Sequence, residues 1–178
     1  MKSIPSRDIS LWIDEYDDIF SDFDPRSYSE RNISDDFVYE LKRLCRESEF
    51  YISEIKLQVP EKLRKEKEES VIVKSLQQYF KKNLLLFSQK LKTEKRKGIL
   101  MIFIAIISMT IGSYLLSIQS THFLIHTLLV IFESSGWFLL WAGFENIIST
   151  HRKELPEFDF FKKLSKCAIR FISIKTAK

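Results

Sequence analysis

One long apolar segment dominates the pattern of hydrophobic and polar positions along this chain. Between Gly98 and His151 the sequence contains no Lys or Arg. Its only acidic residues are Glu133 and Glu145. Because about 20 helical residues cross a bilayer core of about 30 Å, the segment is long enough to cross twice. The polar stretch 117–122 divides it near the middle, so the pattern predicts a hairpin of two transmembrane helices.

The predicted hairpin divides the chain into three regions. An N-terminal region covers residues 1–97, and a C-terminal tail covers residues 150–178. The hairpin between them, residues 98–149, has its two spans at 99–116 and 123–147. The alternative is a buried hairpin in a soluble protein. It would need a large surrounding core, which a chain of 178 residues does not supply.

Basic residues flank the apolar segment on both sides and are missing from its central turn. Residues 81–97 contain seven Lys and Arg, and residues 152–170 contain six. The positive-inside rule therefore predicts a multi-pass protein of the cell (inner) membrane, with both termini in the cytoplasm. Anionic lipid headgroups are the expected partner of these flanks, at about 1 kcal/mol per basic residue. Since this attraction explains the basic runs, no nucleic acid partner is expected.

The N-terminal region contains three predicted elements. A helix is expected at 35–47, with Ser34 as its N-cap. A strand is expected at 51–59, ended by Pro60, and a long helix is expected to follow over 61–97. The alternation of the strand places one set of side chains on the same side: Tyr51, Ser53, Ile55, Leu57 and Val59.

The C-terminal tail allows two interpretations. Residues 168–175 are rich in β-branched and aromatic side chains, which favours a strand after a short helix. This strand is expected to pair with the strand at 51–59. The alternative is that residues 158–172 form a basic amphipathic helix in the membrane interface. The strand interpretation predicts the fold class: a transmembrane helical hairpin with a small cytoplasmic α+β domain built from both chain ends.

Glu133 is the first candidate for a function inside the membrane. It lies near the expected bilayer centre beside Ser134, where an acidic side chain costs roughly 2.5 kcal/mol or more. One hypothesis is that Glu133, Ser134 and Ser108 line a path for ions or protons in an oligomer. The competing hypothesis, which we favour from sequence, is that Glu133 hydrogen-bonds to Ser108 or Thr110 and holds the two helices together.

A second candidate is an acidic, turn-rich motif at residues 21–32, SDFDPRSYSERN. Its proline fixes a turn, its arginine can pair with carboxylates, and its tyrosine can anchor the segment. We expect it to clamp or cap the cytoplasmic domain, or to serve as an assembly motif. The residues that carry this prediction are Asp22, Asp24, Pro25, Arg26 and Tyr28.

The sequence contains little that favours catalysis or metal binding. The acidic run 14–24 has no Gly, and its spacing differs from that of a calcium-binding loop. The two cysteines, Cys45 and Cys167, are far apart in the sequence and lack ligand-like spacing. No nucleophile elbow or phosphate-binding glycine loop occurs. We therefore expect neither an enzyme nor a cofactor.

In the order of these parts, the chain resembles a family of small, uncharacterised bacterial proteins with two transmembrane helices. The resemblance rests on the 21–31 motif, the S-D-D-F sequence at 34–37, and the strand that ends in Val-Pro. It also includes Trp141 and Glu145 near the end of the second span. It implies fold and membrane location, and it implies no activity and no catalytic residue.

These features favour a non-enzymatic membrane protein that self-associates or docks a partner. Small residues at 112–113 and 134–136 would allow two helices to approach closely, which favours a homo-oligomer, and the sequence equally allows a monomeric hairpin. The alternative is a small oligomeric channel, or a membrane-perturbing effector, with a polar path near Glu133. A third hypothesis is a membrane subunit of a larger transporter or enzyme complex.

Overall fold

The computed structural model describes residues 6–47, 51–118 and 122–174, and it divides into two compact units. The first unit combines the chain up to Leu85 with the chain from Phe158 onward, and the second unit spans Leu86–Glu157. The strands are β1 (Ser6–Trp12), β2 (Tyr51–Pro60) and β3 (Ala168–Ile174), and the helices are α1 (Asp35–Glu47), α2 (Glu66–Ser117) and α3 (Phe123–Leu164).

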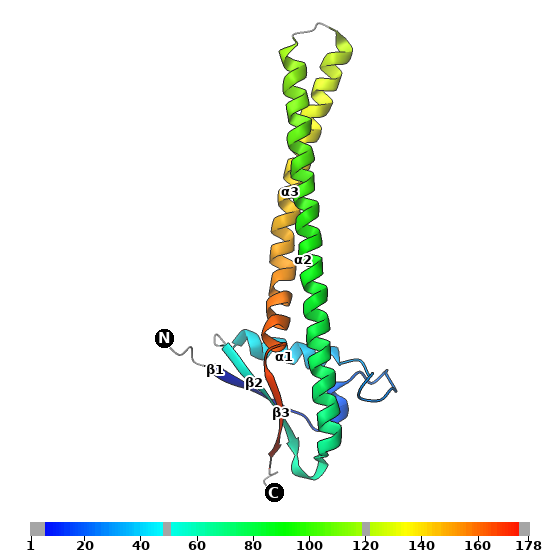
Figure 1. Ribbon diagram of the computed structural model, residues 1–178, viewed down its shortest axis with the longest axis vertical. Coiled ribbons are helices and arrows are strands. Elements are labelled where there is room, and N and C mark those ends of the chain that lie inside the picture. Colours follow the sequence, from blue (N-terminus) through cyan, green and yellow to red (C-terminus); the bar gives the residue numbers. More distant parts are fainter. Residues whose placement is uncertain (1–5, 48–50, 119–121, 175–178) are drawn as a thin grey trace. The chain divides into compact units, whose positions relative to one another are not determined.

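The first unit is built on a three-stranded parallel sheet with β2 in the centre (Figure 1). Parallel neighbours cannot be joined by a tight turn, so each connection must cross back over the sheet. The connection from β1 to β2 contains α1. The connection from β2 to β3 contains both α2 and α3. The helical hairpin is therefore the crossover connection of an α+β domain.

The predicted helix at 35–47 and the strand at 51–59 are confirmed. The predicted pairing of that strand with the tail is also confirmed, because Ile55 pairs with Ile169 and Leu57 with Phe171. The interfacial helix proposed as the alternative for residues 158–172 is wrong beyond Leu164, where the chain turns into β3.

Strand β1 was not predicted from the sequence. Ile9, Leu11 and Ile13 alternate with other positions, which is the period of a strand, and Ile9 and Ile13 are buried. The pairing of β1 with β2 shifts between Arg7 and Ile9, which marks a bulge. Because of this shift, Ile52 shares the buried side with Ile55, and the prediction that Ser53 lies there is wrong.

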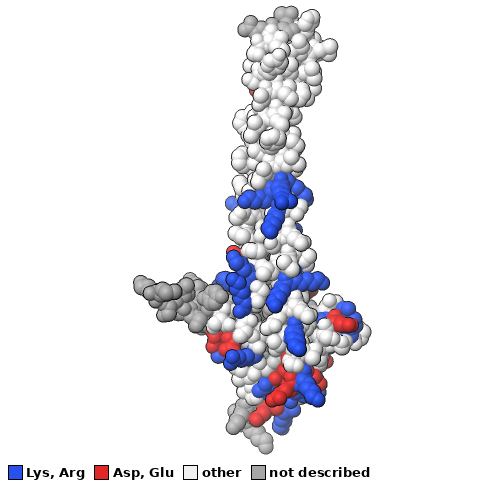
Figure 2. All heavy atoms as spheres, viewed as in Figure 1, with Lys and Arg blue, Asp and Glu red and all other residues white. Residues whose placement is uncertain are grey.

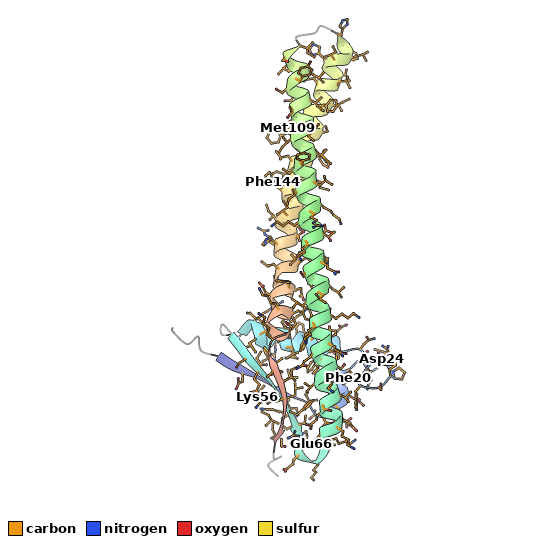
Figure 3. The ribbon with its side chains drawn as sticks, viewed as in Figure 1. Phe20, Asp24, Lys56, Glu66, Met109 and Phe144 are labelled. Atoms are coloured by element: carbon orange, nitrogen blue, oxygen red, sulfur yellow. The ribbon has the colours of Figure 1, made fainter. Side chains whose placement is uncertain are left out.

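The core of the first unit lies on one side of the sheet. The side chains at β2 positions 55, 57 and 59 are at most 1% exposed, as are Ile72, Leu76 and Phe80 of α2. Each such burial contributes roughly 1.5–3 kcal/mol. Helices α1 and α3 add Leu41, Phe161 and Leu164. The opposite side of the sheet is charged. Lys56, which is labelled in Figure 3, is joined to Asp8 at 2.5 Å, and Arg170 is joined to Glu54 at 2.9 Å.

Both long helices differ in extent from the predicted ones. A 3₁₀ turn at Glu61–Leu63 precedes α2, so that helix begins at Glu66 and not at the proline. Helix α3 continues through Pro156 to Leu164, although proline removes the hydrogen bond that its own N–H would donate. The helix expected separately in the tail is thus the last part of α3. Packing of Phe160, Phe161 and Leu164 in the domain core favours this continuation.

The second unit is a pair of helices that meet along a line of small residues. All four glycines of the chain lie on this line. A Cβ atom added to Gly98 would lie 3.0 Å from the Gly143 carbonyl oxygen, and one added to Gly143 would lie 2.9 Å from the Gly98 carbonyl oxygen. On α2 the line continues at seven-residue steps through Ala105, which is 0% exposed, to Gly112. This spacing keeps one seam facing the partner helix.

Away from this seam, the helices of the second unit turn apolar side chains outward. Phe103 is 60% exposed, Phe138 is 72% exposed and Phe123 is 81% exposed. Figure 2 shows the upper part of the hairpin almost free of charged residues. Both helices are long and apolar enough to cross a membrane. Unlike the core helices of soluble proteins, their apolar stretches are mostly exposed.

The seam predicts opposite effects for two glycine substitutions. Gly143→Ala should lower the free energy of unfolding by about 1–3 kcal/mol, because the new Cβ meets backbone atoms of α2. Gly112→Ala is the matched control. Its Cβ would meet its nearest neighbour at 3.6 Å, and alanine favours helix by about 1 kcal/mol over glycine. SDS titration in mixed micelles, followed by tryptophan fluorescence, measures both. Equal effects of the two variants would contradict the seam.

Candidate functional site

The predicted assembly motif forms a closed loop on the first unit, residues 20–33, hereafter the 20–33 loop. Phe20 and Ile33 form an isolated antiparallel bridge at its base, and both are buried. The Ser21 N–H donates to the Asn32 carbonyl oxygen at 2.9 Å. These contacts bring the two ends of the loop together, so its shape is fixed where it leaves the domain.

Asp24 organises the inside of the 20–33 loop (Figure 3). It is only 7% exposed. The Arg26 guanidinium donates to its two oxygens, from Nε at 2.8 Å and from Nη2 at 2.7 Å. The backbone N–H of Asn32 donates to the same carboxylate at 2.8 Å. These donors hold the pKa of Asp24 well below its usual range, with the Arg26 side chain as the largest cause.

A second set of contacts surrounds the Phe20 ring. Tyr28 stacks on Phe20, with ring centroids 5.2 Å apart and an angle of 25° between the rings. Arg31 lies over the same Phe20 ring at 5.7 Å, donates to the Ser21 carbonyl oxygen at 3.1 Å and pairs with Asp17 at 2.7 Å. The loop is therefore held by contacts among its own residues and by the pair with Asp17.

The result of this clamping is an exposed aromatic tip. Phe23 is 97% exposed although its neighbour Asp24 is buried. The structure thus brings Asp24, Arg26 and Tyr28 into one clamp, whereas Asp22 and Pro25 are exposed beside the tip. Phe23 was missed as a candidate. Its signal in the sequence is an aromatic residue between two acids in a turn, which no core position explains.

A buried polar network joins three parts of the first unit. The Tyr16 hydroxyl donates to Glu69 at 2.8 Å and accepts the Lys65 N–H at 3.0 Å. Arg64 donates to both oxygens of Glu69, at 2.9 and 2.8 Å, and to the Ser173 hydroxyl at 3.0 Å. Burial raises the pKa of Tyr16 to about 12, and the Arg64 side chain lowers the pKa of Glu69. The network fixes the start of α2 against the 3₁₀ turn at Tyr16–Ile19 and against β3.

The two cysteines lie in the same core, although 122 positions separate them in the sequence. Both are free thiols. Burial raises the pKa of Cys45 to about 12 and that of Cys167 to about 11. The Cys167 thiol also donates to the Ile52 carbonyl oxygen at 3.1 Å. Since the thiolate is the reactive form, both cysteines are protected from thiol reagents in the folded domain.

The second unit contains a crevice between α2 and α3, with a volume of about 310 Å³. Met109, labelled in Figure 3, belongs to its lining. Glu133 is the acidic residue of the crevice and is exposed. The full lining is Met109, Gly112, Ser113, Leu116, Leu129, Glu133 and Trp137.

The expected hydrogen bonds from Glu133 to Ser108 or Thr110 are not formed. The Ser108 hydroxyl donates to the Phe132 carbonyl oxygen at 2.8 Å and lies 3.0 Å from the Ser135 hydroxyl. Thr110 donates back to its own helix, to the Ile106 carbonyl oxygen at 2.8 Å. Among the residues that the structure describes, Glu133 has no hydrogen-bond or ion-pair partner. Ser108 thus joins the helices through Ser135 and not through Glu133 or Ser134.

Residues 6–47, 51–118 and 122–174 contain no group of three or more His, Cys, Asp and Glu side chains that could hold a metal ion. In the acidic run, Asp18 instead accepts the backbone N–H groups of Asp14 and Glu15, both at 3.0 Å. These acids therefore build the local turn.

Comparisons with protein-family models, with curated proteins and with solved structures found no match to this chain. A functional proposal therefore rests on two features of this chain: an α+β domain with a parallel sheet and a clamped loop, and an apolar helical hairpin. The resemblance to bacterial two-helix proteins stays a prediction.

The clamp predicts that the 20–33 loop depends on the charge of Asp24. Asp24→Ala should speed hydrogen exchange at the Asn32 and Arg26 amides by about tenfold or more, since it removes their acceptor. Asp22→Ala, at an exposed neighbour, is the control and should leave both rates unchanged.

A pH titration of the wild-type loop tests the same contact. Because the pKa of Asp24 is lower in the folded protein than in an unfolded chain, the stability that the clamp contributes is fully present above about pH 4. This contribution should decline as the pH falls from that value toward the lower pKa of the folded state. Free energies of unfolding measured between neutral pH and about pH 3 should therefore fall more in the wild type than in Asp24→Asn, and an equal fall in both would contradict this account.

Proposed function

We propose that this chain is a non-enzymatic, self-associating membrane anchor that holds a docking domain at the cytoplasmic face of a membrane. Support for the anchor comes from the hairpin, whose apolar side chains outside the helix seam are exposed and would need a lipid environment. Support for the orientation comes from the basic residues, which flank the hairpin on the domain side alone.

The observation that carries the docking role is the exposed Phe23 on a preformed loop. A fully exposed aromatic side chain gains nothing for the fold of its own domain. The surrounding loop, by contrast, is fixed by a buried carboxylate and a stacked ring pair. Since a preformed loop loses little conformational freedom on binding, such a tip suits insertion into an apolar pocket of a partner. The exposed Asp22 beside it favours a basic group at the rim of that pocket.

The second candidate function is a small oligomeric channel or membrane-perturbing effector. The observation that favours it is Glu133, an exposed acidic side chain in an otherwise apolar helix. Ion flux through vesicles that contain the purified protein separates the two candidates. An anchor gives no flux above that of empty vesicles, whereas a channel gives flux that Glu133→Gln reduces. A membrane subunit of a larger complex is a special case of the docking function, in which the partner is permanent.

The proposed topology predicts a specific pattern of thiol labelling in intact cells. Cysteine placed at Ser117, near the turn, should react with a membrane-impermeant maleimide from outside. Cysteine placed at Lys92 should react only after the cells are permeabilised. The wild-type chain provides a low background, because burial raises the pKa of both native cysteines. Labelling of Lys92→Cys before permeabilisation would contradict the orientation.

The docking role predicts that one exposed aromatic residue matters and another does not. Phe23→Ala should reduce the amount of any protein that co-purifies with the chain by about tenfold, in line with the loss of a central aromatic anchor. Tyr39→Ala removes an aromatic side chain that is 65% exposed on α1 and serves as the control. Neither change should alter thermal stability. Equal recovery with both variants would count against the 20–33 loop as the docking element.

A further inference from the structure

Three of the small residues that the sequence offers for self-association, Gly112, Ser135 and Gly136, are already used inside the hairpin. Gly136 is buried, and an added Cβ would lie 3.3 Å from the Ala105 carbonyl oxygen. Gly112 faces the backbone of α3 at Glu133. Ser135 bonds with Ser108 across the seam. A second copy of the chain therefore cannot dock on this seam without separating the two helices, and self-association needs another face.

The crevice face of the outer half of the hairpin offers such a surface. It combines an acceptor and two donors that none of the described residues satisfies. Glu133 has no partner among the residues that the structure describes, and the same holds for the hydroxyl groups of Ser113 and Tyr114. Ser113 lines the crevice with Glu133, and Tyr114 joins Ser113 in a second, more open hollow beside it.

The neighbouring hydroxyl groups show that this lack of partners is selective. Thr110 and Ser117 lie in the same second hollow, and both donate to carbonyl oxygens of their own helix, at 2.8 and 2.7 Å. Polar groups without partners are costly in hydrocarbon, so a face that keeps an acceptor and two donors open is incomplete as a lipid-facing surface.

We propose that this face is the site at which a second copy of the chain docks, in a two-fold symmetric pair. Glu133 of one copy accepts hydrogen bonds from Ser113 and Tyr114 of the partner subunit, and the reverse contact is made at the same time. A symmetric interface of this kind places one surface against itself, so each copy must carry both halves of the contact, as this face does. The inference rests on the proposed membrane location and names the site of self-association.

Two other occupants of the crevice fit the observations less well. A bound cation would need several oxygen ligands, but the next acidic residue of α3, Glu145, lies about 18 Å away at 1.5 Å of rise per residue. A lipid chain would fill the apolar part of the crevice and leave the carboxylate without a donor. A second copy supplies hydroxyl donors at the level of Glu133.

The test is resonance energy transfer between donor-labelled and acceptor-labelled copies in lipid vesicles, over a range of protein-to-lipid ratios. Glu133→Leu should weaken association by about tenfold or more. Glu133→Gln, which retains a hydrogen-bond acceptor, should stay near wild type. Glu145→Leu, an exposed acid on the same helix, is the matched control and should associate as wild type does. Glu133→Leu that associates like wild type, or Glu145→Leu that is equally weakened, overturns the proposal.

Mixing two variants distinguishes contact between copies from an effect within one copy. The double variant Ser113→Ala/Tyr114→Phe removes the donors, and Glu133→Leu removes the acceptor. Each alone should associate weakly, but a mixture should recover part of the energy transfer, because one of the two symmetric contacts is intact. A mixture no better than either variant overturns the proposal. Flotation of the chain with the vesicles is measured first, since a chain that does not float contradicts the membrane function itself.

Discussion

The parallel pairing of β2 with β3 is the constraint on which the rest of this structure depends. β2 ends at Pro60 and β3 begins at Ala168, yet the two strands lie side by side and point in the same direction. A chain that leaves a parallel strand must return to its start, and here the returning segment is the whole helical hairpin. Both ends of the hairpin therefore belong to one folded domain. In the proposed anchor role, the hairpin would hold its domain through two covalent connections, whereas a single terminal helix would provide one.

The hairpin meets a different constraint, because two helices have little surface to share. Glycines at the seam let the backbones approach until carbonyl oxygens limit the distance. The seam uses up the small residues and leaves the large apolar side chains outside. Because the small residues lie inside the seam and the large apolar ones outside it, the surface of the hairpin is apolar. An exposed polar side chain such as Glu133 is therefore an exception on this surface. In the first unit, by contrast, the buried acidic groups have partners: the carboxylates of Asp24 and Glu69 each pair with an arginine.

The sequence predicted those parts of the fold that depend on local pattern. Composition alone located the hairpin, and periodicity located α1 and β2. β1 was missed because its alternation is short and begins near the chain terminus, where only pairing with β2 stabilises it. The bulge near Ser53 shifts the strand by one position, which no pattern within the strand reveals. Pro156 disfavours the interior of a helix, but tertiary packing of the last helical turns of α3 overrides this local preference.

For the candidate sites, residue types were predictable and contacts were not. The arginine of the acidic motif was expected to pair with a carboxylate, and in the 20–33 loop Arg26 pairs with Asp24. The exposure of Phe23 follows from the closure of that loop by Phe20 and Ile33, a contact 13 residues apart that local spacing does not encode. Glu133 was located correctly in the second helix. Its expected partner was wrong because the rotation of one helix against the other, set by the glycines, directs Ser108 to Phe132 and Ser135.

Cross-linking between β2 and β3 in the membrane tests the central claim most directly. Gln58 and Ile172 are paired in the sheet, so cysteines at both positions should form a disulfide in inverted membrane vesicles under mild oxidation. Trp12 pairs with Gln58 from the other side, which leaves the whole of β2 between it and Ile172. Cysteines at Trp12 and Ile172 should therefore stay unlinked. A link in the first variant alone is the predicted result. No link in either variant, or equal linking in both, would contradict a domain closed by its two chain ends around a membrane hairpin.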